Sequence, residues 1–183
     1  MDTRDCIIRE ARPEDDAALG ALLVDAFIAQ YARKLPEVRY TEERKSDLRD
    51  VARKRSVARV LVAEVAGQVV GTVTLWPPST PGSEAWIPGA ADLRALATSV
   101  DFHGRGLSGP LLDAAEQLAR QWGAPAVCAH VRRGADGVAR LYQRRGFVRD
   151  PAGDMDRLPL VFLEAYVLRF QTGGGGREGM SVG

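Results

Sequence analysis

The chain has 183 residues and a formal net charge of +1, with 45% apolar and 27% charged residues. A near-neutral chain presents no field that would attract nucleic acid or an anionic membrane, and its two distant cysteines, Cys6 and Cys128, favour neither a disulfide framework nor a metal site. Without an N-terminal signal pattern or an apolar run long enough to span a bilayer, the sequence predicts a cytoplasmic protein.

Local patterns predict the elements of the first half. Proline and acids at positions 13–16 suit a helix start, and Thr41 is a candidate cap for a second helix. Two β-branched runs flank Ala66-Gly67-Gln68, which predicts a hairpin. The predicted order is a strand at 6–9, helices from 13 to about 30 and from 41 to about 55, strands at 59–65 and 69–76, a long proline-rich loop to 89, and a strand at 91–100.

The second half continues with alternating helices and strands. Apolar residues at helical spacing, from Leu111 to Trp122, predict a helix that follows the turn at 103–106. A strand at 126–131, a short helix from 136 that ends at Gly146, a strand from 147 and a last strand at 160–170 follow. Residues 1–170 are expected to form one domain, and the glycine-rich tail at 171–183 is expected to be disordered.

The turn from His103 to Gly109 joins the longest predicted strand to the longest predicted helix. A glycine-rich turn that leads into a helix leaves backbone N–H groups without partners, and the helix dipole adds partial positive charge there. Such a turn is suited to binding a phosphate group, and Arg105 could add a charge-assisted contact. The simpler alternative is that Gly104 and Gly106 only permit a tight connection.

Two kinds of phosphate site fit these glycines. Gly104-x-Gly106-x-x-Gly109 satisfies the dinucleotide fingerprint, and Arg132-Arg133 after the next strand could hold the 2′-phosphate of NADP. Against this alternative, a Rossmann domain repeats its strand–helix unit several times, whereas only about 50 residues follow this helix.

The second kind of site rests on a resemblance. LATSVDFHGRGLSGPLL, residues 96–112, resembles the motif of the GNAT N-acetyltransferase superfamily, in which an Arg/Gln-x-x-Gly-x-Gly/Ala turn binds the pyrophosphate of acetyl-coenzyme A (acetyl-CoA). About 35 residues later, ARLYQRRGFV resembles the Leu-Tyr-x-x-x-Gly-Phe motif of the same superfamily. The chain departs from the family pattern at Val100 (usually proline), His103 (usually Arg or Gln), Ser108 (usually Gly or Ala) and Ala135 (usually asparagine).

The resemblance implies an α/β fold with a central twisted mixed sheet of six to seven strands flanked by about four helices. It also implies an acetyl-CoA-dependent N-acetyltransferase that acts on an amine of a small molecule, peptide or protein. Many members of the family pair through their sheets, which leaves a homodimer open. The cofactor-binding residues that it implies are Thr98, Ser99, Val100, His103, Gly104, Arg105, Gly106, Leu107, Ser108 and Gly109.

The same resemblance assigns catalytic roles. Tyr142 is the expected acid, because the tyrosine of this motif commonly protonates the departing sulfur and a phenol with a pKa of about 10 carries its proton at neutral pH. N–H groups freed by a strand bulge around residues 98–100 would polarise the thioester carbonyl. Asp92 is the first candidate for the base, with Glu84 and His130 left open.

The acceptor side is less readable. The resemblance places the segment between the first two helices along the acceptor cleft, which makes Tyr31, Arg39 and Tyr40 candidates, and the proline-rich loop adds Glu84 and Trp86. The departures from the family pattern keep a second function open, namely a sensor that binds acyl-CoA without catalysis.

Overall fold

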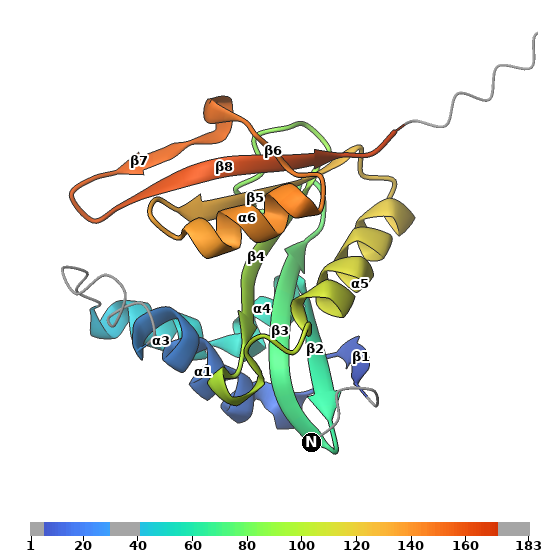
Figure 1. Ribbon diagram of the computed structural model, residues 1–183, viewed down its shortest axis with the longest axis vertical. Helices are drawn as coiled ribbons and strands as arrows, with labels where there is room; N and C mark the ends of the chain where they lie inside the picture. The colour runs from blue at the N-terminus through green and yellow to red at the C-terminus, as the bar shows by residue number, and fades with distance from the viewer. Residues whose placement is uncertain (1–5, 30–40, 172–183) are drawn as a thin grey trace, which may run out of the picture.

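The computed structural model describes residues 6–29 and 41–171. Within these residues eight strands form one sheet in the order β1-β2-β3-β4-β5-β8-β6, and β7 also pairs with β8 (Figure 1). Every neighbouring pair is antiparallel except β4 and β5. The strands are β1 (Ile7–Glu10), β2 (Arg59–Val65), β3 (Gln68–Trp76), β4 (Ala91–Thr98), β5 (Ala126–Arg132), β6 (Val148–Arg149), β7 (Met155–Arg157) and β8 (Val161–Arg169).

Helices cover both faces of this sheet. Among the described residues they are α1 (Asp16–Val24), which continues as a π-helical turn (Asp25–Ala29), then α3 (Glu42–Arg49), α4 (Val51–Val57), α5 (Ser108–Gln121) and α6 (Asp136–Arg144). None of these helices has the length and apolarity needed to cross a bilayer. The predicted mixed α/β fold is confirmed, with one strand and one helix more than expected.

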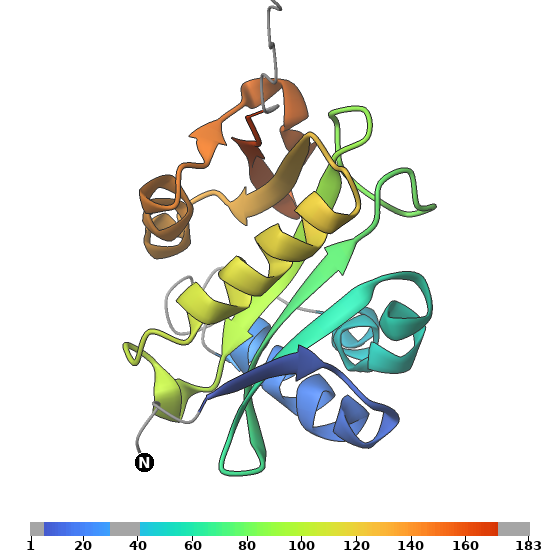
Figure 2. The same cartoon turned by 90° about the vertical axis from the view of Figure 1, so that its right-hand side faces the viewer.

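The two faces carry separate apolar cores. On one face α5 and α6 pack on the sheet through a large core that includes Leu111, Leu112 and Tyr142 (Figure 2). On the other face α1, α3 and α4 bury Leu19, Leu48 and their neighbours against β2 and β4. A third and smaller core lies where the loop between β3 and β4 covers β5 and β8.

The sheet divides between β4 and β5. These strands pair only over Ala91–Leu93 and Val127–Ala129, whereas β5 pairs with β8 over its whole length. Beyond residue 93 the two strands diverge, so β5 and β8 run across the direction of β3 and β4 (Figure 1). The edge of β4 from residue 94 to 98 therefore has no strand partner on that side among the described residues.

This topology overturns the dinucleotide alternative. A Rossmann domain binds its cofactor at the carboxyl ends of a largely parallel sheet. Within the described residues only one pair of neighbouring strands is parallel, and all the others are antiparallel.

Local differences from the predicted elements have local causes. The single helix expected at 41–55 is two helices, because the Asp50 side chain accepts the Arg53 N–H at 3.2 Å and starts α4 anew. The expected cap at Thr41 is confirmed by its bond from the Arg44 N–H. β4 ends at Thr98 rather than 100, since a 3₁₀ turn follows. Tyr31, Arg39, Tyr40 and the tail beyond 171 lie outside the described residues.

Candidate functional site

The glycine turn before α5 is open on its outer side. Gly104 and Gly106 have φ angles of +73° and +79°, a conformation that L side chains rarely adopt. A Cβ atom added to either glycine, or to Gly109, would meet no atom within 4 Å. The glycines therefore serve the backbone conformation, and no side chain of the described residues fills the space beside them.

Several N–H groups of this turn have no partner. The Arg105 and Gly109 N–H groups each donate to a turn carbonyl at 3.3 Å. The other N–H groups at the start of α5 donate to no atom of the described chain; they belong to Gly104, Gly106, Leu107 and Ser108. Four such donors at the positive end of a 14-residue helix form a site suited to an anion.

Close packing fixes the position of α5 on the sheet. Leu111, Leu112, Ala115 and Ala119 are fully buried along one face of this helix. A Cβ atom on Gly71 of β3 would lie 3.1 Å from Leu111 Cδ1, so glycine lets the helix approach the strand closely. The same packing buries the Leu107 side chain, which leaves only its backbone to the site.

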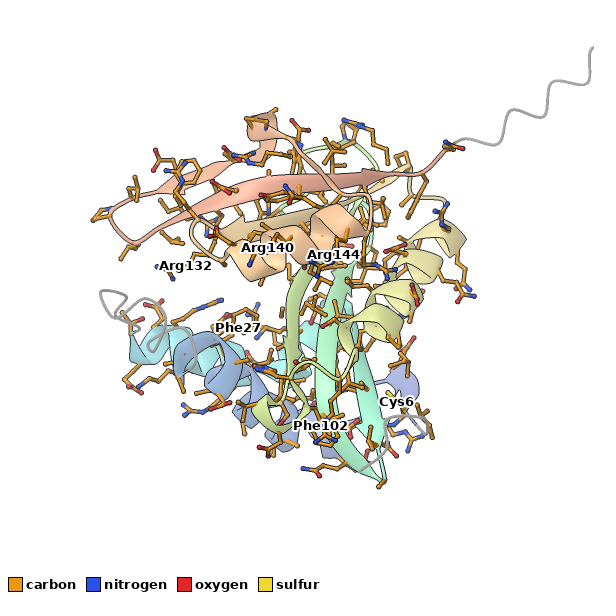
Figure 3. The ribbon with its side chains drawn as sticks, viewed as in Figure 1. Cys6, Phe27, Phe102, Arg132, Arg140 and Arg144 are labelled. Carbon is orange, nitrogen blue, oxygen red and sulfur yellow. The ribbon has the colours of Figure 1, made fainter. Side chains whose placement is uncertain are left out.

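His103 and Arg105 flank the turn from the strand side. The His103 ring lies 3.1 Å from the Thr98 carbonyl oxygen through Nε2, and the Arg105 guanidinium lies 5.1 Å from the centre of the Phe102 ring. Phe102 anchors the turn in the main core (Figure 3). The predicted phosphate-binding residues are thus gathered at one end of β4.

The bulge in β4 lies earlier than predicted. Ala95 has a φ of +55°, and Val73 of β3 faces two residues of β4, which places the bulge at 95–96 rather than 98–100. The Ser99 N–H is already bonded to the Val70 carbonyl at 2.8 Å. Because strand amides alternate in direction, the N–H group of Thr98, next to the bonded Ser99, faces the open edge of β4. An alanine at positive φ has no sequence signal, which is why the bulge was misplaced.

Tyr142 comes from α6 and is packed into the main core. Its side chain is 3% exposed, and its ring centre lies 4.9 Å from that of Phe147. Both residues belong to the second sequence motif, so the motif places this tyrosine against the sheet on the same face as α5. Ala135 is the N-cap of α6 and supplies no side-chain bond.

Asp92 lies under the loop between β3 and β4. Its side chain is 0% exposed, and its Oδ2 accepts the Glu84 N–H and the Arg94 Nε–H, both at 2.7 Å. Arg94 also donates to the Gly82 carbonyl. Asp92 Oδ1 has no partner among the described residues. Because a base must reach the proton that it removes, this arrangement favours a positioning role for Asp92 over the predicted role.

The other predicted acceptor or base residues, Glu84, Trp86 and His130, form contacts that hold the loop between β3 and β4 in place. Trp86 donates from Nε1 to Asp150 at 2.9 Å and packs beside His130, with ring centres 5.1 Å apart. His130 Nε2 lies 2.8 Å from the Gly153 carbonyl. A Cβ atom on Gly153 would lie 2.2 Å from the Trp86 ring, so this residue must be glycine. Glu84 forms an ion pair with Arg157 at 3.1 Å.

Neither cysteine is prepared for nucleophilic attack. Burial raises the pKa of Cys128 to about 11, and its side chain lies inside the core below the loop. Burial also raises the pKa of Cys6, which lies beside β1, at one end of the sheet order and four places from β5 (Figure 3). Thiols with raised pKa values stay protonated and are poor nucleophiles at neutral pH.

Comparisons with known proteins agree with this geometry. The model of the acetyltransferase (GNAT) family matches residues 18–147. A GNAT-family acetyltransferase structure from Desulfovibrio desulfuricans is 17% identical, with a TM-score of 0.69 over 90% of this chain and 98% of that one. The PaiA N-acetyltransferase of Thermoplasma acidophilum in complex with coenzyme A is 17% identical (TM-score 0.65; 88% and 98% covered). The ribosomal-protein-alanine N-acetyltransferase of Brucella melitensis is 24% identical (TM-score 0.63; 90% and 99% covered).

Proposed function

The chain belongs to the GNAT acetyltransferase family, and from that premise we propose that it moves an acetyl group from acetyl-CoA directly to an amine. One observation carries the proposal: the unpartnered N–H groups of Gly104, Gly106, Leu107 and Ser108 at the start of α5. They offer a diphosphate several donors and a helix dipole in one place. The open space beside the glycines supports the proposal, because no side chain of the described residues occupies it.

The rest of the cofactor would lie along the open edge of β4. Acetyl-CoA supplies an acetyl group on a thioester, whose thiolate is already a fair leaving group. The outward N–H group of Thr98 would donate to the thioester carbonyl. Tyr142 gives a proton to the departing sulfur. Its burial in the main core beside Phe147 would keep water away from that step.

Direct transfer is the proposed route because the chain lacks a suitable carrier among its cysteines. An acetyl-enzyme intermediate on sulfur needs an accessible thiolate. Cys128 is fully buried with a raised pKa, and Cys6 lies at β1. The amine of the acceptor would therefore attack the thioester carbonyl itself, so that a C–N bond forms as the C–S bond breaks. The amine proton would leave to solvent water. The acceptor is a small molecule, a peptide or a protein, and the likeness to the ribosomal-protein-alanine N-acetyltransferase of Brucella melitensis lends support to the last of these.

Single-turnover acetyl transfer to a panel of amines tests the proposal. Tyr142→Phe should slow transfer about 100-fold, the scale of a lost general acid, while binding of acetyl-CoA is kept. Tyr166→Phe is the matched control, because Tyr166 is a buried tyrosine of β8 that we assign no role, and it should retain the rate. Equal rates in the two variants would refute the role of Tyr142, and failure of CoA to raise the melting temperature would refute the cofactor site.

A second candidate function is an acyl-CoA sensor without catalysis. It is favoured by Ala135, which caps α6 without the side-chain contact that an asparagine would offer. The sensor predicts thermal stabilisation by CoA together with no turnover on any amine of the panel. The same two measurements therefore separate the two functions.

A further inference from the structure

Arg140 and Arg144 of α6 carry two positive charges that the fold does not use. Both side chains are exposed, and neither forms an ion pair or hydrogen bond with any described residue. They stand four residues apart on one helix, so their side chains leave the same face about one turn apart. Two guanidinium groups in that arrangement are able to donate charge-assisted hydrogen bonds to one phosphate group.

The arginines around them are engaged. Arg145 bonds Asp113 and Glu116, Arg149 bonds Asp154, and Arg133 bonds Glu164. Arg145, which is paired, directly follows Arg144, which has no partner among the described residues. Paired and unpaired arginines therefore lie within one turn of each other. The acids of α5 nearest to α6 are thereby neutralised, and the charges of Arg140 and Arg144 remain available for a ligand.

The Arg145 contacts also locate the pair. Asp113 and Glu116 stand in the second and third turns of α5, and Arg145 Nε lies 3.1 Å from Glu116 Oε1. The end of α6 is therefore fixed beside the second and third turns of α5. In Figure 3 Arg140 and Arg144 lie along the lower edge of α6, toward the first turns of α5, and Figure 2 likewise shows α6 next to that part of α5.

We propose that Arg140 and Arg144 bind the ribose 3′-phosphate of CoA and make the protein prefer CoA to 3′-dephospho-CoA. This inference rests on the proposed cofactor site at residues 104–108. A 3′-phosphate is joined to the pyrophosphate through a single ribose, so it must lie within one nucleotide of that turn. As a phosphate monoester it carries close to two negative charges at neutral pH, which matches two guanidinium groups.

The test compares the dissociation constants of CoA and 3′-dephospho-CoA by calorimetry on the full chain. The wild type should bind CoA about tenfold more tightly, the scale of exposed charge-assisted contacts. Arg140→Ala/Arg144→Ala should abolish this preference by weakening CoA alone. Arg12→Ala/Arg49→Ala is the matched control, because it removes two exposed arginines from the region of α1 and α3 with the same change in net charge.

Each other outcome is decisive. If the wild type binds both ligands equally, or if the α6 variant weakens both ligands by the same factor, the inference is wrong and the pyrophosphate site stands. If the control pair reduces the preference as much as the α6 pair, general charge rather than a site is responsible, and the inference is again wrong. If the wild type binds neither ligand, the proposed function fails together with it.

Discussion

The carboxylate of Asp92 shows how surroundings decide what a side chain can do. Its Oδ2 atom is held by a backbone N–H of the loop and by the Arg94 guanidinium, and the loop covers it completely. Charge that is buried and paired in this way contributes to the conformation of the loop. A substrate amine does not reach it in this structure, because the side chain is fully buried.

Asp92→Asn should therefore destabilise the fold rather than remove a base. An asparagine still accepts the Glu84 N–H but removes the buried negative charge that pairs with Arg94, which keeps only the Gly82 carbonyl and the more distant Glu84 carboxylate. We therefore expect the free energy of unfolding to fall by about 3 kcal/mol. The pH dependence of kcat/KM should keep its shape. Arg94→Gln breaks the same ion pair and should lose comparable stability. A variant in which Asp92→Asn alone loses the acidic limb of the profile, with stability intact, would make Asp92 the base.

Sequence patterns were informative at residue scale only where the constraint is local. The positive φ angles at residues 104 and 106 favour glycine, so Gly104 and Gly106 alone are enough to predict the turn. The role of Trp86 depends on Gly153, which is distant in the sequence and pressed against its ring. No pattern within the loop predicts that contact. The expectation that Trp86 meets the acceptor substrate rested on the length of the loop alone.

At the scale of elements, the segment between β4 and α5 is the part to which the ligand would bind. The β2–β3 hairpin offers a comparison, because Gly67 has a φ of +76° and open space around it, as Gly106 does. The two glycines differ only in what lies nearby: a helix start with unpartnered N–H groups in one case and a plain hairpin turn in the other.

Gly106→Ala and Gly67→Ala should cost similar stability, about 1 kcal/mol each, because both force a Cβ into a left-handed conformation. Only Gly106→Ala should also weaken CoA binding, by tenfold or more, since the added methyl group occupies the open side of the turn. Denaturant unfolding and calorimetric titration measure the two effects. Equal loss of CoA affinity in both variants would mean that the turn is merely a connection.

Elements with short-range signals were predicted, and those set by neighbours were not. The hairpin follows from Ala66-Gly67 between two β-branched runs, and α5 follows from its apolar spacing. The break at Asp50 was missed because aspartate inside a helix is only mildly unfavourable. β7 was missed because three residues without alternation give no strand signal, and its pairing with β8 alone defines it.

At the scale of the molecule, the site exists because the sheet changes partners. β5 leaves β4 after three residue pairs and follows β8 instead, which exposes the edge of β4 next to the anion-binding turn. Single-sequence patterns do not encode such divergence, because it depends on pairing between strands far apart in the chain. The family resemblance implied the arrangement of strands and helices. Only the structure shows that β4 and β5 diverge after Leu93.

Amide hydrogen exchange tests most directly whether CoA binds along the open edge of β4. CoA at 100 times its dissociation constant should stabilise the fold by about 2.7 kcal/mol through mass action. Beyond this global effect, protection should rise specifically at the N–H groups of Thr98, Gly106 and Ser108, which have no partner among the residues that the structure describes. The Ser99 N–H is the internal control, because it is already bonded to Val70 and faces away from the open edge. Exchange that slows equally at Ser99 and Thr98 would show that CoA acts through general stabilisation, and that the edge of β4 does not receive it.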